Sequence, residues 1–202
     1  MLVIQEILYL FITYFIAAIP FGLVITKIFA KKDVRKFGSK NIGATNVARV
    51  AGKKLALITL ILDGCKGAIM VIIARFYFVQ ADNLNIFLVF IALVAIIAHI
   101  YPIYLKFKGG KGVATALATL LAIDFSIGLL AICFWILTFS FCRISAVASL
   151  IAISSTIFSS IYYQSPLEQI FFSIIISIII TIRHKDNIIR IITGEENKFE
   201  NK

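Results

Sequence analysis

Long uninterrupted runs of apolar residues constrain this chain more than any other feature. Residues 113–142 contain one acidic side chain and no basic one, and a helix needs about 20 apolar residues to cross a hydrocarbon core. Of the 202 residues, 61% are hydrophobic and only 15% are charged, whereas about a quarter of the residues in a soluble domain are charged. The short alternating segments of a transmembrane barrel are missing. We therefore predict an all-α membrane protein.

Basic residues between the apolar runs predict the topology. The run 113–142 is too long for one spanning helix and too short for two full ones. Basic residues concentrate in cytoplasmic loops. If the chain turns at Asp124, a good helix N-cap residue, the basic stretches all share one side and only Arg75 lies towards the other. We predict seven transmembrane helices, two of them short, with the N-terminus outside and the C-terminus cytoplasmic, in a single domain of residues 1–202.

The cysteines give no sign of a metal site or a disulfide framework. Cys65, Cys133 and Cys142 lie in or beside apolar runs at unrelated spacings, with no CxxC pair and no Cys/His ligand set. We expect no metal, no cofactor and no nucleic-acid partner.

Residues 38–49 form the first of four polar clusters, all on the predicted cytoplasmic face. Glycines let backbone amides turn inward towards an anion. Ser39 and Thr45 can donate to oxyanions, and Arg49 can bind a phosphate through two parallel hydrogen bonds. An ordinary basic loop would account for the lysines of this stretch but not for Asn41 and its neighbouring glycines. The cluster favours phosphate binding.

The second cluster is Asp63 and Lys66, within an apolar run. Ionisable residues at membrane depth are costly and usually paired, and these two lie at i and i+3 on one helix face. A structural ion pair and a direct substrate role both remain open.

The third cluster is a glycine-rich turn that leads into the apolar run 113–142. It holds Gly109, Gly110, Lys111 and Gly112. A helix N-terminus after such a turn offers free amides and a positive dipole end to an anion. Because Gly112 follows Lys111, the GxxxxGK[ST] pattern of a nucleotide-binding P-loop is not met. His99, upstream on an apolar helix, is more often a packing residue than a catalyst.

The fourth cluster is the tail from Arg183 to Glu196. A basic anchor touching anionic lipid explains its arginines and lysine, but it has no use for His184 and Asn187 at i and i+3. Ser149, on the sixth expected helix, is by itself best explained as a packing residue, since serines are common at membrane helix interfaces.

Taken in order, these clusters resemble a known family. The chain reads Ile-Pro-Phe-Gly at 19–22, Gly-Ser-x-Asn-x-Gly-Ala-Thr-Asn-Val-x-Arg at 38–49, Asp-x-x-Lys-Gly at 63–67, His-x-x-Pro at 99–102, Phe-Lys-Gly-Gly-Lys-Gly-Val-Ala-Thr at 107–115 and Arg-His-x-x-Asn-Ile-x-Arg at 183–190. This is similar to the bacterial acyl-phosphate:glycerol-3-phosphate acyltransferases, which are integral membrane enzymes. Departures from the family pattern are small residues exchanged for other small residues at 17, 18 and 98, and Lys40 where glycine is usual.

The resemblance implies a reaction, its partners and a place in the cell. A fatty acyl group would pass from a long-chain acyl phosphate to sn-glycerol 3-phosphate, giving 1-acyl-glycerol 3-phosphate (lysophosphatidic acid) and phosphate in phospholipid biosynthesis. The enzyme would lie in the bacterial cytoplasmic (inner) membrane among lipid, and the enzyme that produces acyl phosphate is a candidate partner.

The resemblance also implies roles for individual residues. The catalytic set would be Ser39, Arg49, Lys111, His184 and Asn187. The substrate-binding set would be Asn41, Thr45, Gly109, Gly110, Gly112 and Ser149, and Glu196 would be structural.

The chemistry expected of these residues is positioning rather than covalent catalysis. An acyl phosphate is already activated, so charge stabilisation and orientation suffice, and no GxSxG elbow is present. The proton of the attacking hydroxyl could go to the phosphate of the donor or to His184. A membrane transporter of a small organic phosphate is the alternative, since transporters share basic glycine loops and short helices. It is weakened by the placement of every polar cluster on one face.

Overall fold

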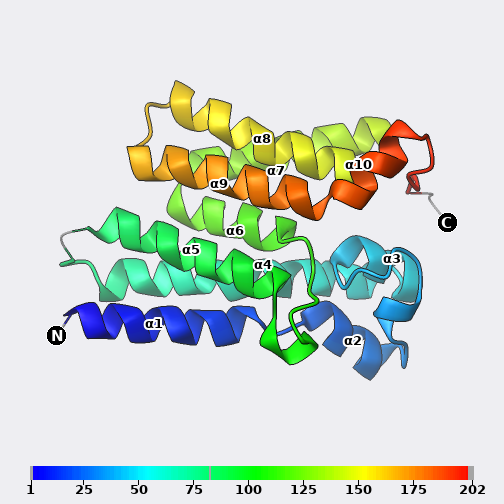
Figure 1. Cartoon of the computed structure of the whole chain (residues 1–202), viewed down its shortest axis with the longest axis horizontal. Helices are drawn as coiled ribbons and strands as arrows, with labels where there is room; N and C mark the ends of the chain where they lie inside the picture. The colour runs from blue at the N-terminus through cyan, green and yellow to red at the C-terminus, as the bar shows by residue number, and fades with distance from the viewer. Residues whose placement is uncertain (1, 82, 200–202) are drawn as a thin grey trace.

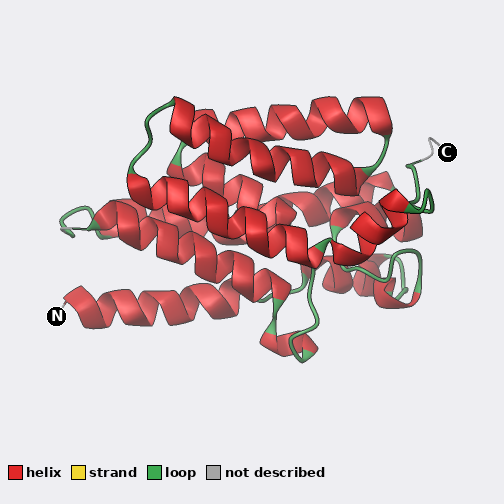
Figure 2. Cartoon of the chain, turned by 45° about the horizontal axis from the view of Figure 1, so that its top comes forward, coloured by secondary structure: helices red, strands yellow, loops and turns green. Residues whose placement is uncertain are grey.

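The computed structural model describes residues 2–81 and 83–199, and over these residues every regular element is a helix (Figures 1 and 2). Two 3-10 turns, Val34–Lys36 and Ile103–Leu105, lie in connecting loops. The α-helices are α1 (Leu2–Ala17), α2 (Phe21–Phe29), α3 (Ala44–Ala51), α4 (Lys53–Tyr77), α5 (Leu84–Ile100), α6 (Val113–Ile123), α7 (Phe125–Cys142), α8 (Ser145–Tyr162), α9 (Leu167–Arg183) and α10 (Lys185–Ile192). The prediction of an all-α membrane protein is confirmed.

The described part of the chain holds 5 helical segments long and apolar enough to cross a membrane. They are Val3–Phe29, Lys53–Tyr77, Leu84–Leu105, Phe125–Cys142 and Ser145–Tyr162. Helix α9 and helix α10, bent by 64° at their junction, would together make a sixth, and α6 is a shorter apolar helix. The seven-helix count and the orientation of the termini stay predictions.

The chain breaks at Asp124 as predicted, but the two helices beside the break differ in length. Helix α6 has 11 residues and α7 has 18, so the expectation of two short helices is wrong for α7. The Asp124 side chain accepts a hydrogen bond from the Ile127 amide at 3.1 Å and so caps the start of α7. Arg75 donates to the carbonyls of Ala122 and Ile123 at 3.0 and 2.7 Å, which satisfies the end of α6.

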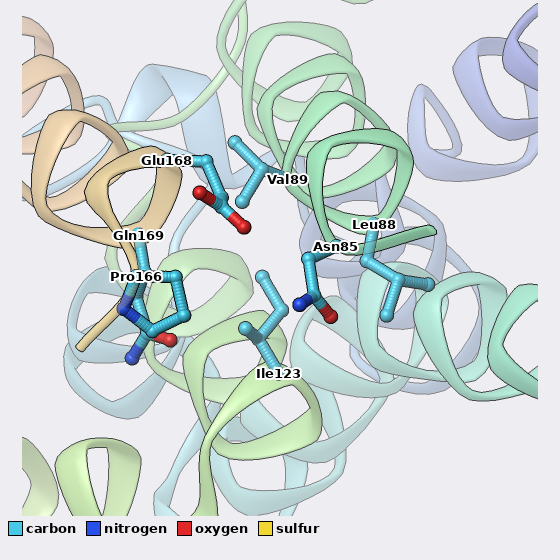
Figure 3. Close-up of a pocket in the computed structure, with 7 residues that line it drawn as sticks. All are labelled: Asn85, Leu88, Val89, Ile123, Pro166, Glu168 and Gln169. Carbon is cyan, nitrogen blue, oxygen red and sulfur yellow. The ribbon is translucent and has the colours of Figure 1, made fainter. Parts of the chain in front are cut away.

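A small pocket lies at this same end of the bundle, where α5 and α9 begin and α6 ends. Figure 3 shows Glu168 and Asn85 among the side chains around it, which come from these three helices. Gln169 also donates to Asp124 at 3.2 Å, so the corner is tied to α9. The pocket is therefore remote from the glycine-rich turn, which follows the opposite end of α5.

Two local features differ from a simple series of spanning helices. The first apolar run is broken at Ile19 and Pro20, which separates α1 from α2. Residues 44–51, expected as loop, form the short helix α3. Its amphipathic pattern buries Asn46 and Val47 against neighbouring elements. Because this packing depends on those other elements, the sequence of residues 44–51 alone does not predict it.

The core of the bundle is aliphatic and its outer surface is also apolar. Ile96, Leu120 and Ile176, from α5, α6 and α9, are completely buried. Large apolar side chains such as Phe76 and Phe141 remain 76% and 87% exposed on the outside. A surface of this kind suits a hydrocarbon environment rather than water.

Candidate active site

The glycine-rich turn between α5 and α6 folds back on the end of α5. The amides of Gly109 and Gly110 donate to the carbonyls of Ile100 and His99 at 3.0 and 3.1 Å. These two amides are therefore not free for an anion, contrary to the sequence expectation. Both glycines instead allow a close approach, because a Cβ at Gly110 would collide with the His99 ring and one at Gly109 would collide with the same backbone carbonyls.

The start of α6 supplies the free donors that the two glycines do not. Gly112 takes a φ of +87°, which favours glycine, and its carbonyl accepts the first helical hydrogen bond from Ala116 at 2.8 Å. The first amides of a helix have no acceptor within it. The amides from Gly112 to Thr115 therefore have no acceptor within α6, and they follow Lys111 at the positive end of the helix dipole.

Lys111 is joined to the tail through a chain of side chains. Its ammonium donates to Asn187 Oδ1 on α10. The Asn187 amide donates to Glu196 Oε1 at 2.8 Å, and Arg190 Nε donates to Glu196 Oε2 at 2.7 Å. Glu196 thus orients Asn187, which fits the structural role expected of it.

The charges around Lys111 are mostly positive. Burial lowers the pKa of Lys111 to about 8; the charge of Glu196 opposes this shift, and the charges of Arg190, Arg183 and Arg49 add to it. Such a group of cations, partly removed from water, is stabilised by an anion. A phosphate placed among them would restore the charged form of Lys111.

His184 lies between α9 and α10, buried beside this cluster. Its Nδ1 is 2.8 Å from the carbonyl oxygen of Ile180, which can only accept, so the proton belongs on Nδ1 and Nε2 is left as an acceptor. Burial, and then the charge of Lys111, lowers the pKa of His184 to about 4. The imidazole is therefore neutral at neutral pH and a weak base in the absence of substrate.

Asn46 organises the first polar cluster. It accepts from the Ser39 amide at 2.9 Å and donates to the carbonyls of Val34, Phe37 and Asn41 at 3.0, 3.1 and 2.8 Å. Sequence reasoning placed Asn46 in the motif but gave it no role. A buried asparagine side chain can pair several backbone groups at once, and this property could have identified Asn46 as the residue that organises the loop.

A second set of polar groups connects α3 with α7 and α8. Thr45 Oγ1 lies 3.0 Å from Ser145 Oγ, and Ser149 Oγ donates to the Ser145 carbonyl at 2.7 Å. Trp135 Nε1 donates to Ser149 Oγ at 3.1 Å. Trp135 was missed from the sequence, since an indole in an apolar run looks like a lipid-facing residue.

The tail crosses from α10 to the end of α7 and completes the arrangement. The carbonyl of Asn197 accepts from Arg49 at 3.1 Å, and the amide of Phe199 donates to the Arg143 carbonyl at 2.7 Å. Helices α3 and α10 gather at one end of the bundle with this tail (Figure 1). Arg49 is thereby held near the Lys111 cluster.

The structure thus unites most of the predicted site residues. Asn187 contacts both Lys111 and Glu196. Arg49 and the neutral His184 lie close enough to Lys111 for electrostatic interaction with it. Thr45 and Ser149 meet through Ser145. The hydroxyl of Ser39 and the side chain of Asn41 make no hydrogen bond to these residues over the described chain, and Asn41 Oδ1 is buried without a partner.

Comparison with known proteins identifies the family. A family model described as glycerol-3-phosphate acyltransferase matches residues 7–194. The chain belongs to the glycerol-3-phosphate acyltransferase family. It is 42% identical over 186 residues to the glycerol-3-phosphate acyltransferase of Ehrlichia ruminantium (strain Gardel), covering 92% of both chains. It is 38% identical over 195 residues to that of Wolbachia pipientis subsp. Culex pipiens (strain wPip), covering 96% of this chain and 99% of the relative.

A solved structure agrees with this assignment. The crystal structure of PlsY (YgiH), an integral membrane glycerol 3-phosphate acyltransferase, in its glycerol 3-phosphate form has a TM-score of 0.90 and 36% identity, covering 97% of this chain and 96% of that one. A second structure of PlsY, in a lysophosphatidic acid form, has a TM-score of 0.87 and 35% identity. Membership of an acyltransferase family makes this chain an enzyme and decides against the transporter alternative.

Proposed function

We propose that this acyltransferase uses a long-chain acyl phosphate as donor and forms 1-acyl-glycerol 3-phosphate and inorganic phosphate. The observation that carries the proposal is the cluster of Lys111, Arg49 and the first amides of α6, which is suited to phosphate groups and lacks an activated nucleophile. Relatives are described as acting on glycerol 3-phosphate. A donor that is itself a phosphate would use the same kind of contacts.

Two phosphates must lie within reach of each other during the reaction. The ammonium of Lys111 and the amides of residues 112–115 are the donors for glycerol 3-phosphate, and Asn187 fixes the direction of the ammonium. Arg49, exposed on α3, would bind the phosphate of the donor, with Ser39 and Asn41 on the preceding loop. Gly109 and Gly110 contribute by shaping the turn, and Ser149 and Thr45 line the side towards α7 and α8.

The acyl transfer itself is a single exchange at the carbonyl carbon. The C1 hydroxyl oxygen of glycerol 3-phosphate attacks the acyl carbon, and a new ester C–O bond forms through a tetrahedral intermediate. The bond from the acyl carbon to the phosphate oxygen then breaks, and phosphate leaves with the electron pair. The cations of the site stabilise the negative charge that develops on the carbonyl oxygen and the leaving group.

The hydroxyl proton goes to the phosphate of the donor in this scheme, which leaves as hydrogen phosphate. In the enzyme without substrate the pKa of His184 lies at about 4, below the value near 6 for the second ionisation of a phosphate group, and on this basis we assign the proton to the phosphate. His184 instead offers the unprotonated Nε2 as a hydrogen-bond acceptor to the C2 hydroxyl of glycerol 3-phosphate, since the single proton of the attacking C1 hydroxyl goes to the phosphate. His184→Gln, which keeps an acceptor near that position, is expected to retain more activity than His184→Ala at every pH.

Measuring products from matched donors tests the proposal. Purified protein is incubated with glycerol 3-phosphate and either palmitoyl phosphate or palmitoyl-CoA, and phosphate, CoA and lysophosphatidic acid are quantified. We expect equal amounts of phosphate and lysophosphatidic acid from palmitoyl phosphate, and loss of both in Lys111→Met. Lysophosphatidic acid formed with palmitoyl-CoA but not with palmitoyl phosphate would refute the donor assignment.

The proposed substrates also specify where the enzyme works. The long acyl chain of the donor partitions into lipid, while glycerol 3-phosphate comes from the cytoplasm, so the site must open to the cytoplasmic side of the bacterial inner membrane. An enzyme that produces acyl phosphate is the partner that this donor requires.

A further inference from the structure

A second group of ionisable side chains lies buried in the bundle, apart from the Lys111 cluster. Asp63 and Lys66 on α4 and His99 near the end of α5 are 1%, 5% and 4% exposed. The sequence left two roles open for Asp63 and Lys66, a structural pair or a direct contact to substrate. The contacts of the three residues distinguish these roles.

The contacts of Lys66 in the described structure are with groups outside the glycine-rich turn. Its ammonium lies 2.9 Å from Asp63 Oδ1 and donates to the carbonyl of Ile19 at 2.9 Å. The Phe21 ring lies beneath it, with 5.8 Å from Nζ to the ring centre. The Ile19 carbonyl belongs to the break between α1 and α2, where the helical pattern of hydrogen bonds is interrupted. Lys66 therefore connects this break to α4, and none of its contacts among the described residues is with the turn at residues 106–112.

Asp63 is connected to both ends of the glycine-rich turn. Its Oδ1 lies 3.7 Å from His99 Nδ1, just before the turn. Its backbone carbonyl accepts from Thr115 Oγ1 at 2.8 Å, in the first turn of α6 just after it. One residue of α4 thus lies against the elements on both sides of residues 106–112.

His99 is the part of this group that touches the turn. Its carbonyl accepts the Gly110 amide at 3.1 Å. Its ring occupies the position that a side chain at residue 110 would take, since a Cβ there would lie 2.9 Å from His99 Cδ2 and 3.0 Å from Cε1. The orientation of the imidazole therefore sets the path of the backbone immediately before Lys111.

We propose that Asp63, Lys66 and His99 form a buried positioning network that holds the turn in the conformation in which Lys111 and the α6 amides bind the phosphate of glycerol 3-phosphate. Asp63 Oδ1 faces His99 Nδ1 at 3.7 Å, beyond hydrogen-bond distance, so the carboxylate acts on the ring as a nearby charge that favours the orientation with Nδ1–H towards it. Lys66 balances the charge of Asp63, which would otherwise be buried alone at a high cost. The inference rests on the proposed role of the turn in binding this substrate.

Two amides of different length test the His99 contact. The amide nitrogen of Asn in His99→Asn takes the place of Nδ1 and can still reach Asp63, whereas that of Gln in His99→Gln takes the place of Nε2. We expect the KM for glycerol 3-phosphate to rise at least about tenfold in His99→Gln and clearly less in His99→Asn, with the KM for the acyl donor unchanged in both. Equal KM values in the two variants, or a parallel change for both substrates, would overturn the proposal.

A double-mutant cycle tests the contact between the network and the turn. Gly110→Ala should weaken glycerol 3-phosphate binding strongly in the wild-type background, because the new methyl group displaces the His99 ring. In a His99→Ala background the methyl group has room, so the same substitution should weaken binding at least about tenfold less. Additive effects would show that Gly110 matters for its approach to phosphate rather than for its contact with His99.

Binding of glycerol 3-phosphate, measured by titration calorimetry on folded protein in detergent, separates the network from the donor assignment. Suppose that the variants show the expected coupling between Gly110 and His99 in glycerol 3-phosphate binding, but the wild type releases no phosphate from palmitoyl phosphate. The donor assignment then fails and the network stands. If phosphate release is normal but the coupling is missing, the network fails alone.

Discussion

The pKa of Lys111 makes the reaction sensitive to alkaline pH in a way that can be assigned to one residue. Burial lowers this pKa to about 8 in the free enzyme, and kcat/KM reports ionisations of the free enzyme. The ammonium is charged below this pKa and becomes neutral as the pH rises through it. If binding requires the cation, kcat/KM for glycerol 3-phosphate is at its plateau below pH 8 and falls above it.

The size of the effect follows from the titration curve. At pH 9, one unit above the pKa, about a tenth of the enzyme keeps a charged Lys111, so kcat/KM should fall about tenfold from its plateau. Glycerol 3-phosphate loses its second proton near pH 6 and stays a dianion over this range. The substrate therefore contributes nothing to the alkaline decrease.

Replacement of the lysine by arginine isolates its contribution. A guanidinium stays charged to beyond pH 12, so Lys111→Arg should lower the plateau, because the contact to Asn187 changes, and abolish the decrease between pH 8 and 10. Lys106→Arg, an exposed residue of the same loop, is the matched control and should keep the wild-type profile. The assay is initial phosphate release from palmitoyl phosphate, corrected at each pH for hydrolysis without enzyme.

An unchanged alkaline decrease in Lys111→Arg would refute the reasoning, since another group would then be titrating. A wild-type profile that stays flat to pH 10 would also refute it. In that case Lys111 would be better solvated than its place in the bundle implies.

Three further substitutions test the surroundings of the site. Glu196→Gln removes the charge and leaves one oxygen acceptor for Asn187 and Arg190. A charged hydrogen bond is worth about 1.5–3 kcal/mol, so kcat/KM should fall about tenfold or more, and Glu196→Asp should have an intermediate effect. Lys40 has a φ of +59°, so Lys40→Gly should stabilise the protein by about 1 kcal/mol in thermal unfolding, and a lower Tm would contradict this. Asn46→Ala leaves a buried amide and several carbonyls unpaired and should cost about 2–4 kcal/mol by the same measurement, while an unchanged Tm would show that water replaces the side chain.

The extent to which the sequence predicts this structure depends on the range of the interactions involved. Helical class and the break at Asp124 follow from hydropathy and from a capping side chain, which act within a few residues. Helix α3 depends on burial of Asn46 and Val47 by elements distant in sequence, so its formation was not foreseen. The family motifs picked out residues far apart in sequence, such as Lys111, Asn187 and Glu196, that the structure brings together, and their roles in the reaction stay predictions.

The glycines of the turn show where local reasoning fails. A glycine-rich turn before a helix favours free amides on general grounds, yet the amides of Gly109 and Gly110 are paired with Ile100 and His99. That pairing requires α5 to end where it does and, in the proposed network, Asp63 on α4 to orient His99. Neither condition can be read from residues 106–112 alone.

The unequal lengths of α6 and α7 and the lowered pKa of Lys111 have one physical origin. In Figure 1, α6 begins nearer the middle of the bundle than α3 and α10, and Lys111 just before it is half-buried, whereas Lys106, Phe107 and Lys108 of the same turn are exposed. A helix that starts at this depth reaches the break at Asp124 after 11 residues. The same depth removes Lys111 from water, which depresses its pKa. For the proposed reaction this position is useful, because the acyl carbon of a lipid-dissolved donor lies near the hydrocarbon boundary and the phosphate of the acceptor must be brought to it. A turn at the surface would keep Lys111 solvated but would hold the attacking hydroxyl too far from that carbon.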